Sequence, residues 1–92
     1  MKAEWTCTPD GLDWWLDPMP PGTAVWAWRA PGGDDEIWHF RADTHATHLA
    51  DTRVTYRAGE HGSADEAKAA AIAAARELFA KVGRQDALEA LP

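Results

Sequence analysis

The chain has 92 residues, of which 46% are hydrophobic and 26% are charged, and its net charge at pH 7 is −6. This length predicts one domain over residues 1–92, and the composition is typical of a globular protein and disfavours disorder. No apolar run is long enough to span a membrane, and the first residues lack the apolar segment of a signal peptide. Cys7 is the single cysteine, which excludes an internal disulfide, so we expect a cytoplasmic protein. The acidic charge argues against a general nucleic-acid binder.

The first part of the chain predicts a β-hairpin with strands at residues 4–8 and 12–16. Pro9-Asp10-Gly11 lies between them, and this composition is typical of a tight turn. Alternation along the second strand places Leu12, Trp14 and Leu16 on one face and Asp13, Trp15 and Asp17 on the other. The proline-rich segment 18–22 then predicts a rigid connector. The sequence leaves open whether this hairpin joins the main sheet.

The middle of the chain predicts a second hairpin, with strands at residues 23–30 and 36–42 and a glycine-containing loop over 31–35. Trp26 and Trp28 share one face of the first strand, and Trp38 and Phe40 share one face of the second. We expect these aromatic side chains to face the core. A polar loop over 43–52 and a short strand over 53–57 follow.

The last third predicts a helix over residues 64–82. Ser63 and Glu66 have the spacing of a capping box, and Gly83 is a typical C-terminal stop. An apolar stripe runs along one helix face, with Ile72 and Phe79 at its edge; its members are Ala67, Ala71, Ala74, Ala75, Leu78 and Val82. A short helical turn is expected over residues 86–91. The predicted fold class is therefore α+β, an antiparallel sheet of three to five strands packed by one C-terminal α-helix.

Residues that could carry catalysis are few. Ser63 is committed to the helix cap, and Cys7 falls in a predicted strand on the apolar side with Trp5, where a buried thiol contributes packing. His45 and His48 lie in a predicted polar loop beside aspartates, but His-x-x-His alone is not a zinc signature, so a solvated loop is favoured over a metal site. We expect no catalytic residue, no metal and no cofactor.

Two charged surfaces remain as candidates for binding. If the aromatic residues of the sheet face the helix, one cationic set faces outward: Arg29, His39, Arg41, Arg53 and Arg57. Such a face fits phosphate or carboxylate groups, although a solvated sheet face that maintains solubility is the more common role. The other surface combines acids with an exposed tryptophan; it contains Asp13, Trp15, Asp17, Asp34, Asp35 and Glu36. Tryptophan is frequent among interface hot spots, whereas burial of both Trp14 and Trp15 is the alternative.

Residues 62–71, Gly-Ser-Ala-Asp-Glu-Ala-Lys-Ala-Ala-Ala, resemble a segment of small phage and prophage proteins in which tryptophan-rich strands precede a capped alanine helix. Among these, the chain is similar in size and build to anti-CRISPR inhibitors, which share no common motif. The resemblance implies a non-enzymatic, phage-encoded inhibitor in the cytoplasm of an infected or lysogenic cell. Its partner would be a host protein or ribonucleoprotein complex, a CRISPR effector whose DNA binding it blocks, and the inhibitor itself would be a monomer or a weak homodimer. The alternative is a small nucleic-acid-binding module that uses the arginine-bearing sheet face.

Overall fold

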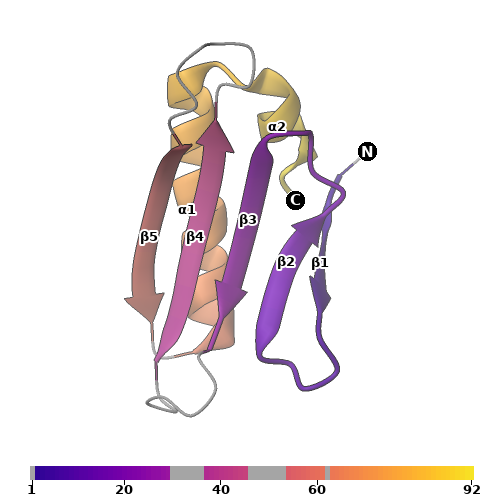
Figure 1. Ribbon diagram of the computed structural model, residues 1–92, viewed down its shortest axis with the longest axis vertical. Helices are drawn as coiled ribbons and strands as arrows, with labels where there is room; N and C mark the ends of the chain where they lie inside the picture. Colours follow the sequence, from indigo (N-terminus) through magenta and orange to yellow (C-terminus); the bar gives the residue numbers. More distant parts are fainter. Residues whose placement is uncertain (1, 30–36, 46–53, 62) are drawn as a thin grey trace.

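The computed structural model describes residues 2–29, 37–45, 54–61 and 63–92. Five strands form one antiparallel sheet in the order β1-β2-β3-β4-β5. Their bounds are Glu4–Cys7 (β1), Asp13–Asp17 (β2), Thr23–Trp28 (β3), Trp38–His45 (β4) and Val54–His61 (β5). Two helices follow, α1 (Ala64–Val82) and α2 (Gln85–Ala90). The α+β prediction is confirmed, and the first hairpin joins the sheet (Figure 1).

The helix α1 has the bounds that its sequence predicted. The Ser63 hydroxyl accepts a hydrogen bond from the Glu66 backbone N–H at 3.2 Å, which satisfies one free donor of the first turn. Gly83 ends the helix in the left-handed region with φ 77°, and the following Arg84 N–H donates to the Phe79 carbonyl oxygen. Both ends are thus fixed by local backbone chemistry.

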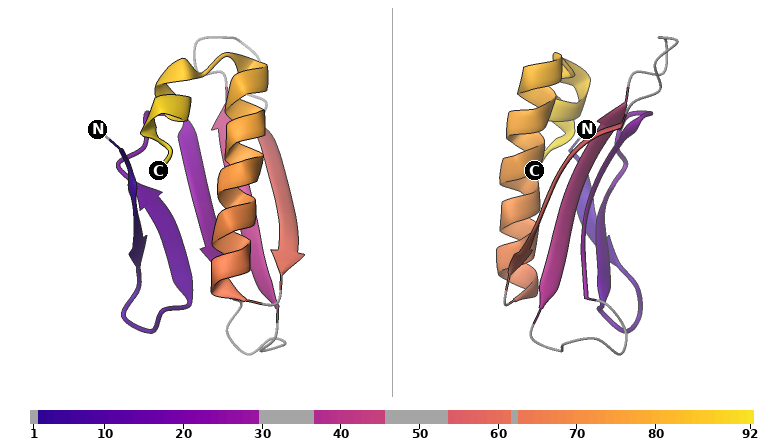
Figure 2. Two further views of the ribbon diagram at one scale, coloured as in Figure 1. Left: turned by 180° about the vertical axis from the view of Figure 1, so that it is seen from behind. Right: turned by 60° about the vertical axis from the view of Figure 1, so that its left-hand side comes forward.

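The two helices lie on one side of the sheet, and the opposite side carries no helix among the described residues (Figure 2). α1 packs over β3, β4 and β5, and its buried residues include Ala67, Ala71, Ala75, Leu78 and Phe79. The predicted stripe is wrong at its end, because Val82 is 43% exposed whereas Phe79 is fully buried. Small alanines let the helix approach the sheet closely, so the core is built from alanine against Val25, Ala42 and the fully buried Phe79.

The two strands β4 and β5 extend beyond their predicted ends. Asp43, Thr44 and His45 continue β4 instead of entering a loop, and residues 58–61 continue β5. The register pairs Trp38 with His61 at one end and His45 with Val54 at the other. Ladder hydrogen bonds with the partner strand therefore outweigh the weak strand propensity of this polar sequence.

The N-terminal segment and α2 close one end of the core. The Ala3 N–H donates to the Ala90 carbonyl oxygen at 2.7 Å, and Ala3, Ala87 and Leu91 are buried together. Arg84 joins α2 to the connector after β2: its Nη2 donates to the Pro21 carbonyl oxygen, and its Nε donates to Asp86 at 3.0 Å. The Arg84 guanidinium holds the pKa of the Asp86 carboxyl below its usual range.

We expect Asp86→Asn to lower the melting temperature slightly at pH 7 and not at all near pH 2. The substitution retains an oxygen that accepts from the Ala87 N–H but removes the charge that Arg84 binds. A lowered folded-state pKa stabilises the protein above the pKa of the unfolded chain, and this contribution is lost as the pH falls through the folded-state pKa. Thermal unfolding of the parent protein and the variant from pH 2 to pH 7 measures the difference in melting temperature. An equal difference at both pH values would contradict the charge interaction.

Candidate functional site: the helix-free face of the sheet

Three of the six tryptophans lie on the side of the sheet that the helices leave open. Along β2, Trp15 is 37% exposed while its neighbour Leu16 is 4% exposed, as the predicted alternation requires. The alternative prediction, that both Trp14 and Trp15 are buried, is therefore wrong. Along β3 the alternation is opposite to the prediction, because Val25 and Ala27 are the buried residues. Trp26 and Trp28 consequently lie on the open face with Trp15.

The inversion of β3 has a packing reason. Every residue from Ala24 to Trp28 is apolar, so hydrophobicity alone does not select a face. Trp38 is 8% exposed on the helix side of β4, beside Ala27 and Ala67. Close-packed interiors tolerate little extra volume, and a tightly seated alanine helix leaves room for Val25 and Ala27 but not for two more indoles.

The side chains of this face are in contact with one another. The Trp26 and Trp28 ring centroids are 6.0 Å apart, and Trp28 stacks on His39 with centroids 5.4 Å apart. The Arg41 guanidinium lies 5.6 Å from the Trp26 ring centroid, and its Nε donates to Asp43 at 2.7 Å. We call the set Trp15, Trp26, Trp28, His39 and Arg41 the tryptophan face. Cross-strand pairs organise it: Trp15 lies opposite Trp26, Trp26 opposite Arg41, and Trp28 opposite His39.

Described members of both surfaces predicted from the sequence lie on this single face. Asp13 and Asp17 flank Trp15 on β2 and are exposed, and Asp13 lies opposite Trp28. His39 and Arg41 lie two strands away on the same side. Of the rest of the predicted cationic set, Arg29 follows the last residue of β3, and the side chain of Arg57 lies outside the part of the chain that the structure describes. Arg53, Asp34, Asp35, Glu36 and His48 lie outside the described residues.

A cleft opens between β2 and β3 where their pairing stops. The register ends at Trp15 opposite Trp26, after three residue pairs, and the strands then diverge toward the connector. A cavity of about 400 Å³ occupies the gap, and its walls include Trp15, Leu16, Met19, Val25 and Trp26. The connector closes the wide end with a Pro20–Thr23 turn, in which Thr23 donates to the Pro20 carbonyl oxygen and Gly22 has φ 79°. No pattern in the sequence signalled this cleft.

The tryptophans on the other side contribute to the core instead. Trp14 is half-buried, its Nε1 donates to the Gly11 carbonyl oxygen at 3.0 Å, and the Lys68 ammonium lies 3.9 Å from its ring centroid. The expected burial of Cys7 is wrong: the thiol is exposed, because β1 is the edge strand and lies beyond the strands that α1 covers. Within the described residues no group of three metal-ligating side chains occurs, and none of their helices is long and apolar enough to cross a membrane.

Comparison with known proteins finds no matching family model, no similar curated protein and no similar solved structure.

Arg41 contacts both the Trp26 ring and the Asp43 carboxylate. A substitution at Arg41 measures how much these two contacts contribute to stability. We expect Arg41→Ala to lower the free energy of unfolding by about 1 kcal/mol, the sum of a partly exposed ion pair and a cation–π contact. Arg41→Lys should recover part of this loss, because lysine keeps the charge but not the flat guanidinium. Urea unfolding followed by circular dichroism measures both. Equal stability of the alanine variant and the parent would show that this cluster contributes nothing to folding.

Proposed function

We propose that this chain is a non-enzymatic protein-binding domain that inhibits a host defence complex, in the manner of an anti-CRISPR protein that blocks target-DNA binding. The observation that supports this function is the tryptophan face, which lies on the helix-free side of the sheet. Tryptophan and arginine are, with tyrosine, the residues most enriched among interface hot spots. A small domain that packs its core with alanine while leaving three indoles on one open face has the composition of an interface.

The acids on the same face favour a basic partner. Asp13 and Asp17 border the indole of Trp15, and both carboxylates are exposed. Effector complexes hold nucleic acid in positively charged channels, so an acidic face with aromatic anchors complements the same lysines and arginines that contact DNA. Charge complementarity of this kind speeds association and selects the partner. Asp34, Asp35 and Glu36, which the sequence assigned to the same binding surface, lie outside the described residues.

A nucleic-acid-binding module is the alternative function. Aromatic rings on an open sheet face can stack on unpaired bases, and His39 and Arg41 lie beside the half-buried Trp28 and Trp26. Arg41 is already paired with Asp43, however, and Asp13 and Asp17 place negative charge where phosphates would lie. The net charge of −6 opposes phosphate binding further.

The deciding experiment measures target-DNA binding by purified CRISPR effector complexes of several types, with and without this protein, alongside the protein alone with DNA. We expect DNA binding by at least one effector to be lost, with no gel shift by the protein alone. A salt-sensitive shift by the protein alone would instead establish the nucleic-acid module. Unchanged DNA binding by every effector in the panel would contradict the inhibitor function.

A further inference from the structure

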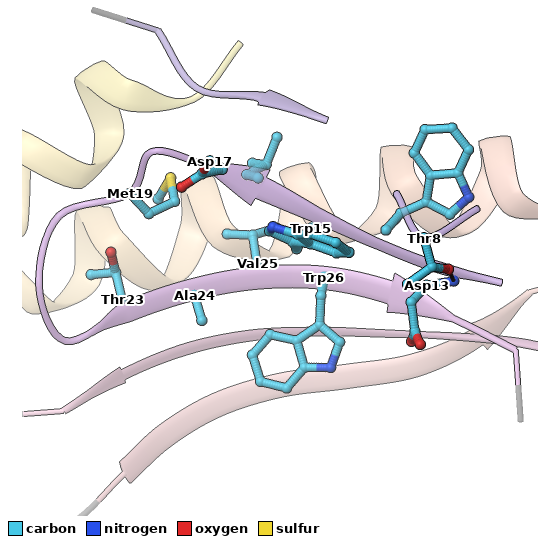
Figure 3. Close-up of a pocket in the computed structure, with 11 residues that line it drawn as sticks. Thr8, Asp13, Trp15, Asp17, Met19, Thr23, Ala24, Val25 and Trp26 are labelled. Atoms are coloured by element: carbon cyan, nitrogen blue, oxygen red, sulfur yellow. Dashed lines mark hydrogen bonds between the residues drawn. The ribbon is translucent and has the colours of Figure 1, made fainter. Parts of the chain in front are cut away.

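The cleft between β2 and β3 has the size and walls of a ligand site. Its volume of about 400 Å³ lies within the roughly 300–1,000 Å³ typical of pockets that bind small groups. The indole of Trp15 lies over the gap between the two strands, with Asp17 and Met19 toward the wide end and Asp13 toward the narrow end (Figure 3). Aromatic and aliphatic surface therefore forms the wall, and a carboxylate stands at each end.

The two carboxylates of this cleft have no basic partner among the described residues. Among the residues that the structure describes, no lysine or arginine forms an ion pair with Asp13 or Asp17. Glu4 lies directly opposite Asp17 in the β1–β2 register and is also exposed, so two like charges face each other across the strands. Facing like charges are unfavourable, and a cation between them would relieve the repulsion.

The neighbouring strands β3 and β4 show which kind of cation binds an indole and a carboxylate together on this face. Arg41 lies over the Trp26 ring and simultaneously binds the Asp43 carboxylate, so one guanidinium uses both an indole and an aspartate of the open face. The cleft offers the same two kinds of partner, the Trp15 indole and an aspartate, and no arginine is among its described lining residues. A planar guanidinium stacks on aromatic faces and binds carboxylates through paired hydrogen bonds, whereas the lysine ammonium is compact and more strongly hydrated.

We propose that this cleft binds the guanidinium of an arginine side chain that the partner protein presents. Trp15 contacts the flat face of the guanidinium, Asp13 or Asp17 accepts its N–H groups, and Met19 contacts the aliphatic stem. A phosphate or another anion would meet unfavourable charge from the aspartates. This inference names the chemistry of the partner contact and so rests on the proposed protein-binding function.

The test uses the full chain labelled with ¹⁵N and the peptide acetyl-Gly-Arg-Gly-amide, followed through the indole Nε1–H signals of Trp15 and Trp26. Peptides with lysine or glutamine at the central position are the matched ligands. We expect a saturable shift of the Trp15 signal with the arginine peptide at millimolar concentration. Binding of the lysine and glutamine peptides should be at least about fivefold weaker, since each loses charge-assisted paired hydrogen bonds.

The variant Asp13→Asn/Asp17→Asn should weaken binding of the arginine peptide at least about fivefold. The control, Glu77→Gln/Glu89→Gln, removes the same charge from exposed helix positions and should leave binding unchanged. Dispersed spectra verify that each variant is folded. Equal binding of the three peptides, no Trp15 shift with any of them, or equal loss in both variants would each overturn the proposal.

The effector assay separates this proposal from the proposed function. If the arginine peptide does not bind but the protein still blocks an effector, the inhibitor function stands and the cleft is not its arginine site. If the peptide binds and no effector is blocked, the cleft stands and the inhibitor function fails.

Discussion

Replacement of Phe79 by alanine should cost about 3–5 kcal/mol of unfolding free energy, the range for deleting a buried aromatic ring. Phe79 is fully buried in the principal core, where it packs with Leu78 between α1 and the sheet. The loss combines the transfer free energy of the ring with the cavity that it leaves. The total free energy of unfolding of a domain of this size is roughly 5–10 kcal/mol, so the variant retains only a small part of its stability.

Urea unfolding followed by far-ultraviolet circular dichroism measures this loss, and the melting temperature should fall by at least about 12 °C for a domain of this length. Val82→Ala is the matched control on the same helix, since Val82 is 43% exposed and its truncation should change stability by no more than about 0.5 kcal/mol. A loss at Phe79 no larger than that at Val82 would show that α1 does not pack on the sheet as described.

Local chemistry made the helix predictable from the sequence. The cap residue Ser63, the acids of the first turn and the stop at Gly83 each act within one turn of the backbone, so their effect can be derived without knowing the rest of the fold. The alternation of β2 was predictable for a similar reason. Acidic Asp13 and Asp17 strongly disfavour burial, which places Trp15 on the solvent side.

The face of β3 could not be derived in the same way. Its Ala24–Trp28 segment is apolar throughout, so its orientation depends on the space beneath α1, and that space is set by helix alanines more than 35 residues away in the sequence. The larger tryptophans consequently occupy the open face and the smaller Val25 and Ala27 the core. The candidate site changed with this inversion, because Trp26 and Trp28 lie between Trp15 of one predicted surface and His39 and Arg41 of the other.

The cleft depends on still longer-range geometry. It exists because β2 and β3 stop pairing after Trp15 and Trp26, while β3 remains paired with β4 along its whole length. Neither strand carries a residue that signals the divergence. Only the connector, with its three prolines and Gly22, indicates that the chain leaves β2 without a tight hairpin.

Trp15→Ala should separate binding from folding most clearly. The side chain is 37% exposed on the open face, so we expect a stability change of about 1 kcal/mol or less. If Trp15 anchors a partner, truncation should cost 2 kcal/mol or more of binding free energy, which corresponds to at least about a 30-fold loss of affinity. The measurement is the concentration of protein that half-inhibits DNA binding by the effector identified in the panel.

Trp14→Phe is the control for this prediction, because Trp14 is the adjacent indole on the opposite face of β2. Its ring contacts Lys68 and its Nε1 bonds to the Gly11 carbonyl oxygen, so the substitution should lower stability rather than inhibition. Opposite responses of two neighbouring tryptophans would locate the interface on the helix-free side of the sheet. A similar loss of inhibition in both variants would indicate that the whole hairpin, and not the tryptophan face, carries the interaction.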